Sequence, residues 1–204
     1  MPIINLDITN RCTLECPHCL RASYKGLGMK VPGRDMTISE YKKIIDKFDV
    51  VRFCGNSSDP VFNPNFIEFL RMSYEKNIKC KIHNAATGKS AKWYKEAFEA
   101  NPDATWFFAI DGLPENSHIY RKNQKAQQLF DMMKMCKDMG LDSVWLYLIF
   151  YYNEDNMDEA QKLADDNGIP IYFLKTTTHT ENNWPTPKNK NNYIESYLDK
   201  KTLS

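Results

Sequence analysis

Three cysteines lie within eight residues near the N-terminus, in the run Cys12-Thr-Leu-Glu-Cys16-Pro-His-Cys19. Thiols this close together in a reducing compartment are metal ligands more often than disulfide partners. A structural zinc site needs four ligands, and the sequence has no second cysteine pair; His18 as the fourth ligand would be strained by its neighbour Cys19. Three thiolates suit a four-iron cluster that leaves one iron open, so the spacing favours a catalytic iron–sulfur site.

The other three cysteines, Cys54, Cys80 and Cys136, are far apart in the sequence. Isolated cysteines are usually small buried apolar residues, and we expect that role for all three. Cys54 comes directly before a polar loop, so it is the one of the three that is placed to approach a site.

The elements that position these residues alternate between strand-like and helix-like patterns. Apolar and β-branched runs predict strands at Ile3–Thr9, Val50–Gly55, Lys79–Asn84, Thr105–Asp111, Ser143–Tyr151 and Ile169–Lys175. Helical periodicity predicts helices at Ser39–Phe48, Asn65–Lys76, Ser90–Ala100, Gln124–Met139 and Asp155–Asn167. Thr37, Ser39 and Asn153 are placed to begin helices, and Gly140 and Gly168 to end them.

Six strands that alternate with helices predict an α/β fold with a parallel sheet, either doubly wound or a barrel with two units missing. In both architectures the active site lies at the carboxyl ends of the strands. The three cysteines follow the first strand, and polar segments follow the second, third and fourth, at residues 55–60, 84–88 and 111–112. The sequence therefore predicts that these segments meet on one rim.

Length and composition predict one soluble domain of 204 residues, with a core at 1–175 and a tail at 176–204. The tail reads as a polar loop followed by a short helix at Tyr193–Lys200. The 27 basic and 26 acidic residues leave a net charge of +1, which argues against a large nucleic-acid partner. Neither an apolar run of about 18 residues nor a signal peptide is visible, so no membrane contact and a cytoplasmic location are expected.

The cysteine run after a first strand resembles the radical S-adenosylmethionine (SAM) enzymes. In that family three cysteines hold a [4Fe–4S] cluster, and SAM binds the open iron through its amino and carboxylate groups. The resemblance implies that Cys12, Cys16 and Cys19 are the cluster ligands and that the fold is a partial (β/α)6 barrel. It covers about residues 3–175.

Further segments resemble the motifs of the family that contact SAM. Phe53–Pro64 resembles the glycine-rich motif, which implies that the SAM amino group contacts Gly55, Asn56, Ser57, Ser58 and Asp59. His18 takes the place of an aromatic residue that packs near the adenine. Asn84 lies in a segment that resembles the one approaching the ribose. Asp111 and Arg121 lie in a stretch common in peptide-modifying members, where the arginine pairs with the SAM carboxylate.

Each of these polar residues also has a plain structural alternative. Asp59 could begin a turn with Pro60, Asn84 could be a turn residue, and Asp111 could cap the following segment. Arg121 could be a solvated surface charge.

The resemblance implies an enzyme that cleaves SAM reductively to a 5′-deoxyadenosyl radical, which takes a hydrogen atom from a substrate. Its partners would be a flavodoxin- or ferredoxin-like one-electron donor and a substrate. The chain looks like the core of the SPASM-type peptide-modifying branch without its auxiliary-cluster domain, so a peptide or protein substrate is expected, with a small metabolite or nucleobase-like substrate as the alternative. Two other classes stay open: a zinc-stabilised binding module and a cluster-binding protein without turnover.

Overall fold

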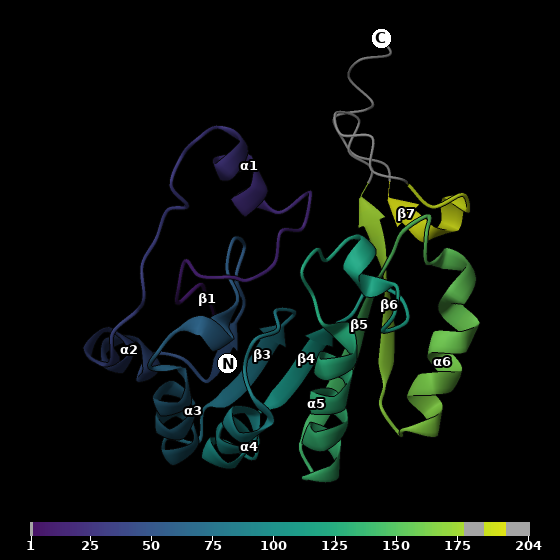
Figure 1. The fold of residues 1–204 in the computed structure, drawn as a ribbon. Coiled ribbons are helices and arrows are strands. Elements are labelled where there is room, and N and C mark those ends of the chain that lie inside the picture. The colour runs from purple at the N-terminus through teal and green to yellow at the C-terminus, as the bar shows by residue number, and fades with distance from the viewer. Residues whose placement is uncertain (1, 178–185, 195–204) are drawn as a thin grey trace.

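The computed structural model describes residues 2–177 and 186–194 and shows one open, fully parallel sheet (Figure 1). The strands follow the chain order, each pairing in parallel with the next. They are β1 (Ile3–Leu6), β2 (Val50–Phe53), β3 (Lys79–Asn84), β4 (Thr105–Ala109), β5 (Asp142–Ile149), β6 (Ile171–Thr177) and β7 (Tyr193–Ile194). Within the described residues β1 and β7 do not pair, so the sheet is an unclosed barrel wall, as the sequence predicts.

Helices cover one face of this sheet. They are α2 (Ile38–Ile45), α3 (Phe66–Glu75), α4 (Ala91–Ala100), α5 (Ala126–Asp138) and α6 (Met157–Asp166). A further helix, α1 (Leu20–Gly26), buries no side chain and stands beyond the strand ends, apart from the others (Figure 1). Short 3-10 helices lie in the connections of the described chain: η1 (Pro60–Phe62), η2 (Ser117–Ile119), η3 (Glu154–Asn156) and η4 (Lys190–Asn192).

The hydrophobic core lies between the sheet and the helices. Successive side chains of a strand point to opposite faces, so every second residue enters this core. Phe53, Ile82, Trp106 and Trp145 are fully buried there. The intervening side chains therefore point to the concave face, which these helices leave uncovered.

The six predicted strands and five predicted helices are all present, with ends that differ by a few residues. Helix α1 is absent from the prediction because it has only seven residues and no buried apolar face from which a helical period could be read. In the tail, residues 193–194 form strand β7 rather than the start of a helix, because they pair with β6. The rest of the predicted helix lies outside the described residues.

The predicted helix ends are mostly confirmed. Thr37 begins α2 in a reciprocal capping box with Glu40. Gly140 and Gly168 follow α5 and α6 with φ values of +85° and +61°, a region that favours glycine at helix ends. Asn153 precedes η3, but its side chain makes no cap, since it binds the backbone of Leu148 instead. The described helices are all too short or too polar to cross a membrane.

Candidate functional site

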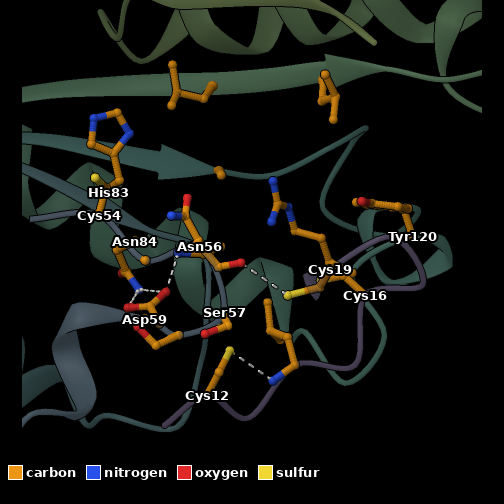
Figure 2. A pocket seen from close by; sticks show the side chains of 18 residues that line it. Cys12, Cys16, Cys19, Cys54, Asn56, Ser57, Asp59, His83, Asn84 and Tyr120 are labelled. Atoms are coloured by element: carbon orange, nitrogen blue, oxygen red, sulfur yellow. Dashed lines mark hydrogen bonds between the residues drawn. The ribbon is translucent and has the colours of Figure 1, made fainter. Parts of the chain in front are cut away.

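A cavity of about 370 Å³ opens at the carboxyl ends of the strands, and Cys12, Cys16 and Cys19 all line it (Figure 2). The polar loop after β2 forms a second wall, from Cys54 to Asp59. The remaining lining residues come from β3, β4 and β5 and the loops after β3 and β4: His83, Asn84, Ala85, Ala109, Tyr120, Arg121, Leu146 and Leu148, with Leu14 from the cysteine loop. The structure thus brings the predicted segments to one rim.

The cysteine loop is held by hydrogen bonds to distant parts of the chain. The Thr13 hydroxyl donates to the Thr87 carbonyl oxygen at 2.8 Å, and the Glu15 amide donates to the Lys122 carbonyl oxygen at 3.1 Å. Within the loop, the Cys19 amide donates to the carbonyl oxygen of Cys16 at 3.1 Å, and α1 begins directly after Cys19. The three thiols are therefore held by the loops after β3 and β4 as well as by their own local turn.

Two of the three thiols, those of Cys12 and Cys16, are poor acids in this protein until a cation binds them. Burial raises the pKa of Cys12 to about 12, with a contribution from the negative charge of Asp59. Burial also raises the pKa of Cys16 to about 11. Metal coordination deprotonates a thiol outright, so a cationic cluster is the kind of group that these three side chains suit. Within residues 2–177 and 186–194, no three His, Cys, Asp or Glu side chains are grouped to hold a single metal ion.

The loop after β2 depends on a glycine at its first position. A Cβ at Gly55 would lie 2.3 Å from the Ser58 carbonyl oxygen, closer than any side chain tolerates. The Asn56 amide donates to Asp7 at 3.1 Å, and the Ser58 hydroxyl donates to the other oxygen of that carboxylate. Ser58 does not adopt the left-handed backbone conformation that would favour glycine. In the described chain the residues other than glycine with a positive φ are Asn77 and Asn123.

The Asp59 carboxylate is turned toward the loop after β3. The amides of Ala85 and Ala86 each donate to its Oδ2 at 2.8 Å, and the Asn84 side chain donates to both oxygens at 3.2 Å (Figure 2). The Val61 amide donates to Oδ1 at 3.3 Å, so Asp59 also begins the short helix η1, as its plain alternative expected. Burial raises the pKa of Asp59, and these donors oppose that rise.

Asn84 is fully buried, and its amide group is occupied on both sides. Its Oδ1 accepts a hydrogen bond from the Tyr94 hydroxyl at 2.7 Å, while its nitrogen donates to Asp59 and to the Ala86 carbonyl oxygen. Asn84 therefore fixes the same junction as Asp59, and it lines the cavity where SAM is predicted to bind.

Asp111 and Arg121 form a buried ion pair, with Oδ2 and Nε 2.8 Å apart. The Leu148 amide donates to the other carboxylate oxygen at 2.9 Å. Burial raises the pKa of Asp111, and the guanidinium charge of Arg121 opposes that rise. The Arg121 side chain is 17% exposed and lines the cavity, so it is not a solvated surface charge.

The structure places His18 beside Tyr120, with ring centroids 6.4 Å apart, and it is Tyr120 that lines the cavity. Cys54 and His83 also line it. The expectation that Cys54 is a buried core residue is wrong, because it directly follows β2 and faces the cavity, while His83, which the sequence did not assign to the site, lies at the end of β3 on the same rim. Cys80 and Cys136 are buried in the core, as predicted.

The sequence comparisons identify the family. Residues 6–166 match the Radical SAM superfamily, which covers most of the chain, and the chain belongs to that family. Members of the family use a [4Fe–4S] cluster and SAM, generally with a reductant and a substrate.

Particular relatives differ widely in their named roles. The chain is 22% identical to pre-heme d1 synthase of Dinoroseobacter shibae, over 85% of its own length and 43% of the relative. It is 23% identical to 7,8-dihydro-6-hydroxymethylpterin dimethyltransferase of Methanocaldococcus jannaschii, over 81% of its length and 34% of that protein. The chain thus spans less than half the length of these curated relatives.

Among solved structures, Streptococcus suis SuiB bound to its precursor peptide SuiA shares the fold. The TM-score is 0.69 at 13% identity, and the match covers 89% of this chain and 40% of SuiB. This likeness confirms the open partial barrel.

Proposed function

We propose that this chain is a radical SAM enzyme, in which Cys12, Cys16 and Cys19 hold a [4Fe–4S] cluster and SAM binds in the adjoining cavity. The observation that carries the proposal is the common cavity of the three thiols, the loop at 55–59 and the Arg121 guanidinium. When bound, the cluster would supply one electron for reductive cleavage of SAM, and the 5′-deoxyadenosyl radical formed in this way would remove a hydrogen atom from the substrate.

The residues of the cavity have separate roles in this proposal. The Arg121 guanidinium, oriented by Asp111, would bind the SAM carboxylate, because its remaining N–H donors form a planar fork. The loop at 55–59 would contact the SAM amino group, with the buried charge of Asp59 favouring a cation nearby. Asn84 would lie along the ribose, and His18 and Tyr120 would stack near the adenine.

For the substrate we propose a peptide or protein, because the segments around Asp111 and Arg121 resemble the peptide-modifying branch. The fold shared with SuiB, which is solved with a precursor peptide, is compatible with it. A small-molecule substrate is the alternative, and the named roles of the curated relatives favour it.

The electron donor would approach from the side of α1. Cys16 and Cys19 also line a second hollow there, together with Arg21 and Lys25. Residues 10–35 carry five basic side chains and two acidic ones, whereas the whole chain is nearly neutral. Ion pairs occupy Arg11, Lys25 and Arg34, and among the described residues Arg21 and Lys30 of this segment form none. A positive surface beside the cluster ligands favours an acidic carrier protein of the flavodoxin or ferredoxin kind.

The test is metal content followed by turnover. Anaerobically reconstituted protein should hold about four iron per chain, and with SAM and dithionite it should release 5′-deoxyadenosine. One zinc per chain and no iron would support the zinc-stabilised module instead. A full complement of iron without 5′-deoxyadenosine would support a cluster-binding protein without turnover.

A further inference from the structure

The concave face of the sheet carries two cations that have no acidic partner among the described residues. Arg52 lies on β2 and Lys81 on β3, and in the parallel register these two residues are direct neighbours. Neither forms an ion pair with any residue that the structure describes, and the Arg52 guanidinium donates at 3.4 Å to the neutral Asn5 amide. Asp7, the acidic residue of the neighbouring strand end, is instead bound by the loop at 56–58.

Both cations point toward the same space as the cofactor cavity. Side chains alternate along a strand, so Arg52 shares a face with Cys54, and Lys81 shares a face with His83. Cys54 and His83 line the cavity, and two residues of a strand span about 7 Å. The positive charges of Arg52 and Lys81 both contribute, after burial, to the lowered pKa of His83, in agreement with this placement. The two cations therefore lie about one pleat below the floor of the cavity.

The other half of the concave face is apolar. The His83 ring stacks on Phe107 of β4, with centroids 4.7 Å apart and planes inclined by 9°. Beyond it, Leu146 is the register neighbour of Tyr172, which is 55% exposed, and Leu148 is the neighbour of Leu174, which is 42% exposed. A polar half on β1–β3 thus meets an apolar half on β4–β6 at the stacked rings.

We propose that Arg52 and Lys81 hold an oxyanion group of the substrate, whose apolar or aromatic body lies on the adjoining apolar half of the concave face. The inference rests on the proposed function for the position of the reacting atom, which lies in the cavity above. A carboxylate suits the pair because a guanidinium fork and an ammonium both form charge-assisted hydrogen bonds to it. The body then lies across Phe107 and the leucines, with its reacting carbon about 7 Å from the oxyanion.

An acidic peptide side chain and a small carboxylic acid share this chemistry, and a binding experiment distinguishes them. Cluster-loaded, SAM-bound protein is titrated anaerobically by calorimetry with 3-phenylpropionate and, separately, with N-acetyl-Phe-Asp-amide. Each acid is compared with its neutral counterpart, 3-phenylpropanamide or N-acetyl-Phe-Asn-amide. We expect at least one acid to bind at least tenfold more tightly than its neutral counterpart. The acid that binds more tightly then shows whether the pair of cations recognises a small carboxylic acid or an acidic peptide side chain.

The variant Arg52→Gln/Lys81→Gln should reduce this preference to less than threefold. Arg71→Gln/Lys134→Gln removes the same two residue types from the exposed surfaces of α3 and α5 and should leave it unchanged. Arg52→Lys keeps the charge and should retain most of the preference, which separates charge recognition from loss of folding.

Any of three results would overturn the inference. The acid and its amide could bind equally well, neither acid could bind at millimolar concentration, or the preference for the acid could survive in Arg52→Gln/Lys81→Gln. The measurement needs no turnover. Absence of 5′-deoxyadenosine alongside intact acid binding would therefore overturn the proposed function alone.

Discussion

Replacing Asp59 by alanine removes the carboxylate that joins the loop after β2 to the loop after β3. Two amides, of Ala85 and Ala86, donate to it at 2.8 Å, and the Asn84 side chain adds longer bonds. In Asp59→Ala these donors stay buried without an acceptor, since Asp59 is 3% exposed and water has little access.

The magnitude follows from these bonds. A buried hydrogen bond to a charged acceptor contributes about 1.5–3 kcal/mol, so loss of the two short ones should lower the free energy of unfolding by about 3–6 kcal/mol. Asp59→Asn keeps one acceptor oxygen but places an NH2 group near other donors, and it should cost about 1–2 kcal/mol. Asp46→Ala is the control, because Asp46 is 63% exposed in a surface ion pair and should cost less than about 1 kcal/mol.

Urea unfolding, followed by the fluorescence of the buried Trp106 and Trp145, measures these differences. With a slope of about 2 kcal/mol per molar urea, Asp59→Ala should lower the midpoint by about 1.5–3 M. SAM affinity, measured separately on cluster-loaded protein, should also fall. A loss of stability below about 1 kcal/mol, with SAM affinity reduced nonetheless, would refute the role of Asp59 in joining the loops and leave it as a direct SAM contact.

Other substitutions test the remaining parts of the site. Cys16→Ala should abolish cluster binding, and an unchanged iron content would exclude this thiol as a ligand. Arg121→Ala leaves the Asp111 carboxylate buried without its partner and should cost about 3–5 kcal/mol near pH 8. Because loss of the guanidinium raises the pKa of Asp111 further above its unfolded value, this cost should shrink as the pH falls toward about 4; a cost independent of pH would contradict the ion pair. Gly55→Ala should destabilise the protein by about 1–3 kcal/mol and weaken SAM binding, since its Cβ would overlap the Ser58 carbonyl oxygen; a fully stable variant would show that the loop can shift.

The sequence was sufficient where the pattern is local. The position of Cys12, Cys16 and Cys19 directly after the first strand predicted that the thiols meet the other polar loops at one rim of the sheet, as the structure shows, while their role as metal ligands stays a prediction. Strand–helix alternation predicted the parallel sheet, and the family resemblance selected the partial barrel over a doubly wound fold. Both features are encoded within short windows of the chain.

The sequence was insufficient where the hydrogen-bond partners of a residue lie far from it in the chain. Asp59 meets Ala85 and Ala86 across 26 and 27 residues, and no local pattern reveals which donors its carboxylate faces. Gln124 was predicted as the first residue of a helix. In the structure its buried side chain instead donates hydrogen bonds to the carbonyl oxygens of Ala85 and Ala109. The neighbouring positions of Arg52 and Lys81 also could not be predicted, because the sequence indicates that β2 and β3 are buried on both faces, whereas the helices leave the concave face uncovered.

The contacts of the cysteine loop form at different times during synthesis of the chain. Because the strands pair in chain order, each new strand can join its predecessor as it leaves the ribosome. The three thiols emerge early, yet their anchor at Lys122 follows about 100 residues later, a delay of about 5–20 s at ordinary rates of translation. Under the proposed function, the anchored loop that would receive the cluster is complete only after Lys122 has been synthesised.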